Sequence, residues 1–366
     1  MLKRRIGAAE LHHACFFRSS VSPPHRKALI QITERCNLRC VHCFVSARQH
    51  GREMSLNEIK KSVLPSLVSA NVKSITLTGG EPMIHPDICE IVRSAVQDFN
   101  FPVTICSNGE GIDLERLSFF RSLERVYFNI SLDGFSDTSH GRFRGSRTSF
   151  SVAKEAIKKL ASHQILKGIL VTPNKLGTLD EYKAMCRFAA EQGAEYVLMN
   201  PLYSFGRGVH SAVALRADDN FMLALSEEMD RTRGIEMVKI RFPNSDSKNL
   251  TGCDAGRIIY VYTAGDVAVC PYLTFAATTP NSKYDRSDFI VGNLLTGSEI
   301  LEPLEKFDVD SLFGGANSDC APCSRVENCG RGCPAVVVAS GGYLGEVDSE
   351  MCPKIANRPP STMICE

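Results

Sequence analysis

Three closely spaced cysteines place the strongest constraint on this chain. Cys36, Cys40 and Cys43 are separated by three and then two residues, and they follow a short apolar run. Four thiolates would close a cubane iron–sulfur cluster, whereas three thiolates hold three irons and leave the fourth without a protein ligand. Zinc sites usually close with four ligands, and no fourth such ligand lies nearby. The spacing therefore favours a cluster with one open iron over a zinc site or a group of buried thiols.

The same spacing, CxxxCxxC, resembles the signature of radical S-adenosylmethionine (SAM) enzymes. In that superfamily the fourth iron chelates the amino and carboxylate groups of SAM. The resemblance implies that an electron passes through this cluster and cleaves SAM to methionine and a 5′-deoxyadenosyl radical, which removes a hydrogen atom from a substrate. An electron donor such as flavodoxin or ferredoxin is implied as a partner.

The number of cysteines agrees with iron–sulfur chemistry. The chain has 15 cysteines among 366 residues, a net charge of +1 and 43% hydrophobic residues. A disulfide framework would suit a short secreted protein, but this chain is long and its N-terminus is a poor export signal. The near-neutral charge supplies no field for nucleic acid, and no apolar run is long enough to span a bilayer. We therefore expect a cytoplasmic protein with neither nucleic acid nor membrane as a partner.

Short apolar strands alternate with helical patterns over the first half of the chain. Such alternation predicts parallel strands joined by right-handed helical crossovers. The expected strands are 29–32, 74–77, 102–105, 126–130, 168–171 and 196–199. The expected fold is α/β, a partial (β/α)6 TIM-like barrel followed by a cysteine-rich SPASM domain. The expected divisions are an arm (1–27), the barrel (28–205), a bridging segment (206–250) with a helix near 217–232, and the SPASM domain (251–366).

Polar and glycine residues follow the second, third and fourth expected strands. In barrels of this kind the chemistry lies on loops at the C-terminal ends of the strands. Resemblance to the radical SAM enzymes implies that a Gly-Gly-Glu loop binds the SAM amino group and that residues at the end of the fourth strand make further SAM contacts. It also implies that an arginine binds the SAM carboxylate. Arg144 is the candidate, and Arg142 and Arg147 are close enough in sequence to compete for this role. The candidates are Gly79, Gly80, Glu81, Ser107, Asn108, Ser131, Asp133 and Arg144.

A second set of cysteines begins at Cys253 and resembles the SPASM domain. It runs as Cys253, Gly265, Cys270, Cys320-x2-Cys323-x5-Cys329-x3-Cys333 and Cys352. The resemblance implies two auxiliary [4Fe-4S] clusters, and hence three in all, with Cys320, Cys323, Cys329 and Cys352 on one and Cys253, Cys270 and Cys333 on the other. The cluster held by Cys253, Cys270 and Cys333 therefore lacks a fourth thiolate. Its fourth ligand could be Cys365, a non-cysteine side chain such as Asp254, or the substrate. A zinc ribbon is the competing interpretation.

Five cysteines remain outside these sets: Cys15, Cys89, Cys106, Cys186 and Cys365. Cys89, Cys106 and Cys186 lie on helix or strand patterns, where a buried thiol usually belongs to the core. A thiol facing the barrel interior could give a hydrogen atom to a substrate radical. Cys186 is the candidate for that role, although its helical position argues for burial away from the cavity.

SPASM proteins most often modify ribosomally made peptides or proteins. The resemblance therefore implies a maturase that forms a crosslink, a thioether or an oxidised residue. The alternative is a dehydrogenase or epimerase of a small molecule such as an aminocyclitol, sugar or tetrapyrrole, because the 27 residues of the arm are too few for a peptide-recognition module. A non-catalytic iron–sulfur electron carrier is a third class, and it would not need Gly79, Gly80 and Glu81.

Overall fold

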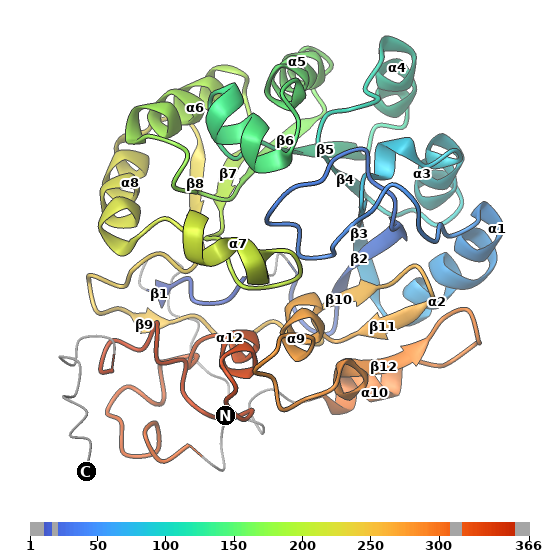
Figure 1. The fold of residues 1–366 in the computed structure, drawn as a ribbon. Coiled ribbons are helices and arrows are strands. Elements are labelled where there is room, and N and C mark those ends of the chain that lie inside the picture. The colour runs from blue at the N-terminus through green and yellow to red at the C-terminus, as the bar shows by residue number, and fades with distance from the viewer. Residues whose placement is uncertain (1–10, 17–20, 308–316, 356–366) are drawn as a thin grey trace.

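The computed structural model describes residues 11–16, 21–307 and 317–355, and its centre is a curved sheet (Figure 1). Within these ranges, ten strands form one sheet in the order β12-β11-β10-β2-β3-β4-β5-β6-β7-β8. The strands are β2 (Arg26–Thr33), β3 (Val72–Gly79), β4 (Val103–Ser107), β5 (Val126–Ser131), β6 (Leu166–Val171), β7 (Tyr196–Met199), β8 (Glu236–Lys239), β10 (Ile258–Val261), β11 (Asp266–Ala268) and β12 (Ile290–Asn293).

Seven consecutive strands, β2 to β8, pair in parallel and form the partial barrel. Helices cover the outside of this curved sheet (Figure 1). They are α1 (Leu56–Glu58), α2 (Leu64–Ser69), α3 (Ile88–Gln97), α4 (Leu114–Ser122), α5 (Ser149–Ser162), α6 (Leu179–Glu191) and α8 (Asp219–Arg231). The α/β fold expected from the sequence is confirmed, since each of the six expected strands overlaps one of β2 to β7. The expected bridging segment supplies α8 and a further parallel strand, β8.

Capping side chains fix where two of the helical stretches begin. Residues 56–69 form one continuous helical stretch, in which a π-helical segment joins α1 to α2. Ser55 accepts a hydrogen bond from the backbone N–H of Glu58, and the Glu58 carboxylate accepts one from the backbone N–H of Ser55. Thr178 and Glu181 make the same reciprocal pair at the start of α6. Both capping boxes were expected from the sequence.

The cysteine-rich part of the chain continues the barrel sheet. Strand β10 pairs in parallel with β2, with Ile258 opposite Lys27, and β11 and β12 then extend the sheet in antiparallel fashion. The other α-helices of the described ranges are α7 (Gly208–Leu215), α9 (Pro271–Ala277), α10 (Leu301–Lys306) and α12 (Pro334–Ala339), and α9 packs against α12. The segments before and after residue 251 therefore share one sheet and one continuous apolar core.

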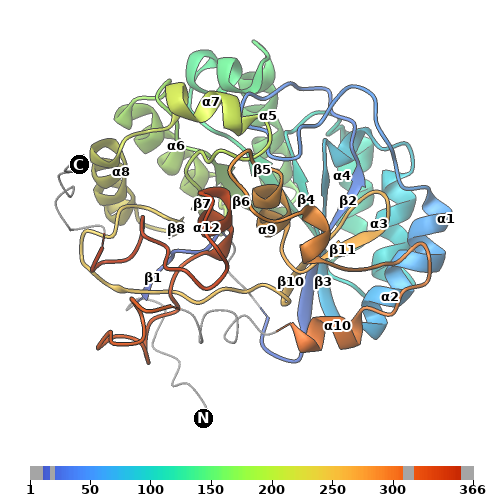
Figure 2. The same ribbon diagram turned by 60° about the horizontal axis from the view of Figure 1, so that its bottom comes forward.

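The described part of the N-terminal arm joins the C-terminal region. Strand β1 (Leu11–His12) pairs in parallel with β9 (Asn249–Leu250), and Figure 1 shows the two side by side. Figure 2 shows β1 close to the yellow segment that leads to β10. Phe16 then stacks on Tyr272 with ring centroids 4.2 Å apart. Residues 11–16 of the arm are thus packed between the barrel and the cysteine-rich part. In the described ranges, no helix combines the length and the apolar character needed to cross a membrane.

Replacing Ser55 by alanine should remove the cap of the helical stretch 56–69. The backbone N–H group of Glu58 then has no side-chain acceptor, so we expect the free energy of unfolding to fall by about 1 kcal/mol. Anaerobic urea unfolding measures this change. Ser69→Ala is the matched control, since this exposed serine lies in the last turn of the same stretch. Equal losses in the two variants would contradict the capping role.

Candidate active site

The three motif cysteines lie on the loop that leaves β2. Cys36 and Cys40 are buried, whereas Cys43 is half-buried. The backbone N–H of Cys36 donates to the carbonyl of Arg48 at 2.7 Å, which folds the loop back on itself. Burial raises the pKa of the Cys36 thiol to about 12. Because iron ligation requires the thiolate, loading a cluster here releases protons. Three thiols on one folded loop suit a cluster held through three irons.

Gly79 and Gly80 allow a second loop to pass directly against the cysteine loop. The backbone N–H of Gly80 donates to the carbonyl of Thr33 at 2.8 Å, and that of Glu81 donates to the carbonyl of Arg35 at 2.9 Å. A Cβ on Gly80 would overlap the Arg35 carbonyl oxygen and would also touch the side chain of Cys36. The two glycines are therefore required for this close approach, before any ligand is considered.

Glu81 is a buried carboxylate that joins two strand ends. Its oxygens accept hydrogen bonds from the hydroxyl of Ser107 at 2.8 Å and from the backbone N–H groups of Asn108 at 2.7 Å and Met83 at 3.0 Å. Burial raises the pKa of Glu81 to about 7, against the effect of these hydrogen bonds. The Asn108 side chain donates to Asn37, which lies between the motif cysteines, at 2.9 Å. The ends of β3 and β4 are thus tied to the cysteine loop.

Asp133 and Arg144 form a buried ion pair beside Cys40. Arg144 Nε donates to Asp133 Oδ2 at 2.6 Å, and Arg144 Nη1 lies 3.9 Å from the sulfur of Cys40. Burial alone would raise the pKa of Asp133, but the nearby Arg144 charge holds it below its usual value. The other carboxylate oxygen accepts from the backbone N–H of Thr172 at 2.9 Å. A fixed cation therefore faces the cluster loop.

His42 has a neighbour that the sequence alone did not reveal. Its ring stacks on Phe143 with centroids 4.1 Å apart and planes 6° from parallel, and its Nε2 lies 3.6 Å from Asp133 Oδ2. Burial lowers the pKa of His42 to about 4, so the ring is neutral at pH 7. His42 thus packs the loop against the segment that carries Arg144.

Two further residues near the cluster loop come from the segment expected to be a bridge. The backbone N–H of Arg207 donates to the carbonyl of Cys43 at 3.0 Å, and its guanidinium donates to the carbonyls of Cys40 and Ala47, both at 2.7 Å. A Cβ on the preceding Gly206 would overlap the backbone of the cysteine loop. The sequence shows the glycine, but it does not show its contact with the cysteine loop, because that loop lies far away along the chain.

The remaining barrel candidates have contrasting positions. Ser131 is half-buried at the end of β5, next to the strand ends described above. Cys186 is 1% exposed on α6 and belongs to the main apolar core, and burial raises its pKa to about 12. The loops that carry the cluster cysteines are separate elements from this helix. A role for Cys186 as hydrogen-atom donor stays a prediction.

Cys320, Cys323, Cys329 and Cys352 line one cavity of about 60 Å³. Arg325, Arg331 and Lys354 also line it, so cationic groups surround the four thiols. Burial raises the pKa of the Cys320 thiol, and the three neighbouring cysteines add to this effect against the charge of Arg331. Four thiols around one cavity, with cations to offset the charge of thiolates, suit a cluster closed by four cysteines.

Cys253, Cys270 and Cys333 meet at a second place. Cys333 is buried in the main apolar core at the start of α12, and Cys253 and Cys270 pack against that core. Burial, together with the neighbouring Cys253 and Cys333, raises the pKa of the Cys270 thiol. No set of three or more His, Cys, Asp or Glu side chains in the described ranges is spaced to hold a single metal ion. A four-iron cluster is larger than one ion and places one thiolate on each iron. Cys365, one candidate for the missing fourth ligand, lies outside the described residues.

Comparison with known proteins agrees with this geometry. The model of the radical SAM superfamily matches residues 30–189. The mycofactocin maturase MftC of Mycobacterium ulcerans is 27% identical over 337 residues, which cover 87% of this chain and 86% of that protein. The AdoMet-dependent heme synthase of Methanosarcina barkeri is 26% identical over 341 residues, which cover 86% of this chain and 93% of that protein.

Solved structures share the fold. Streptococcus suis SuiB bound to S-adenosylmethionine superposes with a TM-score of 0.67 at 16% identity, covering 89% of this chain and 76% of SuiB. SuiB bound to the precursor peptide SuiA gives a TM-score of 0.65 at 16% identity, with 89% and 75% covered. At 16% identity, these comparisons support only a similar fold of the barrel and of the C-terminal part.

Replacing Gly80 by alanine should separate the two loops. The added Cβ collides with backbone atoms of Arg35, which cannot swing aside as a flexible side chain could. We expect the iron content of the reconstituted protein to fall by roughly one cubane, about four irons per chain. Gly193→Ala is the control for backbone strain, because φ there is +71° while a Cβ meets nothing within 4 Å, and it should keep its iron. Full iron content in the Gly80 variant would contradict the proposed loop contact.

Proposed function

Because this chain belongs to the radical SAM superfamily and its C-terminal part is a SPASM domain, we propose that it is a radical SAM maturase. It cleaves SAM reductively at the loop of Cys36, Cys40 and Cys43 and removes a hydrogen atom from a peptide or protein. The observation that supports this most is the contact of the cysteine loop with the ends of β3, β4 and β5, which surrounds three thiols with glycines and fixed polar groups.

We assign separate tasks to the residues of this site. When bound, the cluster supplies one open iron and the electron for SAM cleavage. Its thiolate ligands are Cys36, Cys40 and Cys43, and the SAM contacts are Gly79, Gly80, Glu81, Ser107, Asn108, Ser131, Asp133 and Arg144. The burial of Glu81 and Asp133, both 1% exposed, keeps these groups rigid and excludes water. Arg144 presents a fixed cation for the SAM carboxylate.

A peptide substrate is favoured by the relatives. MftC is a maturase by name, and SuiB has been crystallised with its precursor peptide. The product would carry a crosslink, a thioether or an oxidised residue. The auxiliary clusters would accept the electron left on the substrate, and flavodoxin or ferredoxin would feed the site cluster.

A tetrapyrrole substrate is the second candidate, because the heme synthase matches this chain along nearly its whole length. Anaerobic turnover separates the two candidates. We expect 5′-deoxyadenosine formation to rise in the presence of a short precursor peptide encoded beside this gene, with a matching mass change in the peptide. A rise with an iron porphyrin and none with the peptide would instead identify the small-molecule enzyme.

The thiolate assignments are tested by single alanine substitutions. We expect Cys40→Ala to abolish formation of 5′-deoxyadenosine with dithionite, because the open-iron cluster loses a ligand. Cys329→Ala should reduce product formation and leave some SAM cleavage, since it alters only an auxiliary cluster. Cys89→Ala, at a half-buried cysteine of α3, is the control and should behave as the wild type.

SAM cleavage by the Cys40 variant at the wild-type rate would show that the cluster has been assigned wrongly. Chromatography of the quenched reaction measures the nucleoside directly, so the test does not require the substrate to be known. The iron content of each variant, measured in the same preparation, shows which cluster was lost.

A further inference from the structure

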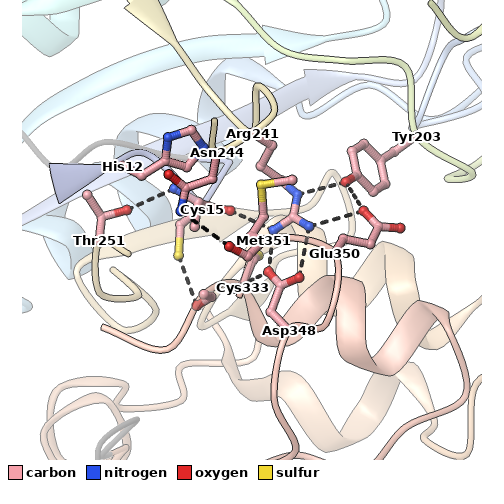
Figure 3. Close-up of polar contacts among 12 residues, drawn as sticks. His12, Cys15, Tyr203, Arg241, Asn244, Thr251, Cys333, Asp348, Glu350 and Met351 are labelled. Atoms are coloured by element: carbon pink, nitrogen blue, oxygen red, sulfur yellow. Dashed lines mark hydrogen bonds and ion pairs between the residues drawn. The ribbon is translucent and has the colours of Figure 1, made fainter. Parts of the chain in front are cut away.

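A fourth cysteine lies with Cys253, Cys270 and Cys333. Cys15 is 6% exposed, and its sulfur donates to the carbonyl of Gly332 at 3.3 Å, next to Cys333 (Figure 3). Cys15 and Cys333 belong to the same apolar core, and Cys253 packs against it. Cys270 also packs against this core, and Phe16, the residue after Cys15, stacks on Tyr272, two residues after Cys270. Four buried or half-buried cysteines from distant parts of the sequence are therefore brought into one region.

The backbone just before Cys15 is held in place. Thr251, two residues before Cys253, donates its backbone N–H to the carbonyl of His12 at 2.8 Å. Its hydroxyl accepts from the backbone N–H of Ala14 at 3.1 Å. These bonds continue the pairing of β1 with β9 up to the two cysteines. Cys15 and Cys253 are thus brought together by backbone pairing and not by contact of their side chains alone.

A buried arginine joins Cys15 to Cys333 from the other side. Arg241 donates from Nη1 to the carbonyl of Ala14 at 2.7 Å and pairs with both carboxylate oxygens of Asp348. Asp348 also accepts the backbone N–H of Cys333 at 2.9 Å. Both charged side chains are at most 1% exposed. Figure 3 shows this guanidinium between the arm and the C-terminal segment. A buried ion pair of this kind stays in place only when its hydrogen bonds are satisfied.

We propose that Cys15 is the fourth thiolate of the auxiliary cluster held by Cys253, Cys270 and Cys333. This inference rests on the proposed function, because it takes the presence of that cluster from there. The thiolate would come from the N-terminal arm, in place of Cys365, Asp254 or the substrate. A four-iron cluster with four thiolates has no iron free for a substrate. The cluster would then act by accepting or passing electrons and not by binding the substrate directly.

The test uses a variant without the site cluster. In the triple variant Cys36→Ala, Cys40→Ala, Cys43→Ala, the two auxiliary clusters alone should give about eight irons per chain. We expect Cys15→Ala in this background to lose roughly one iron per chain on mild oxidation and to show the electron paramagnetic resonance signal of a three-iron cluster. Cys15→Ser should keep the iron and shift the signal of the reduced cluster, because oxygen replaces sulfur.

Cys365→Ala and Asp254→Ala in the same background serve as matched controls, and both should leave iron content and spectrum unchanged. The inference is overturned if Cys15→Ala and Cys15→Ser both match the parent spectrum, or if the Cys365 or Asp254 variant shows the loss instead. If Cys15→Ala does not fold, the spectrum of the Cys15→Ser variant tests the inference in its place. The proposed function fails separately, if the wild-type chain with all its clusters forms no 5′-deoxyadenosine.

Discussion

Two backbone hydrogen bonds between the cysteine loop and the glycine loop position the rest of the site. They run from Gly80 to Thr33, the last residue of β2, and from Glu81 to Arg35, and they continue the pairing of β2 and β3 past the end of β3. Only residues without a Cβ can pass at this distance. Glu81 then reaches β4 through Ser107 and Asn108. The loop that carries the three cysteines is therefore fixed by the sheet itself.

Charge at this site is balanced within the protein. The carboxylate of Asp133 is buried, and it is offset by Arg144 and by a backbone N–H group. Removing one partner of such a pair leaves a buried charge without compensation, which is far more costly than losing an exposed ion pair. The geometry around Cys40 thus depends on a pair whose two members both lie in the connection between β5 and α5. His42, neutral and stacked on Phe143, adds packing without adding charge.

Local patterns predicted much of the fold and of the site. β-branched runs and capping boxes located β2 to β7 and the starts of two helical stretches, because both depend on neighbouring residues. Strand β8 and the pairing of β10 with β2 were not predicted, since no local pattern states which distant strand will pair. Cys15 was set aside for the same reason. It meets Gly332, 317 positions along the chain, through an arm whose polar sequence gave no sign of burial.

The central claim is that three thiolates leave one iron open to SAM, and labelled SAM tests it most directly. Electron nuclear double resonance on the reduced protein, with ¹⁷O in the carboxylate or ¹⁵N in the amino group of SAM, detects whether these atoms bind the cluster. Our account expects hyperfine coupling to both labels in the wild-type protein and none in the variant that lacks Cys36, Cys40 and Cys43. Absence of coupling in the iron-loaded wild-type protein would contradict it.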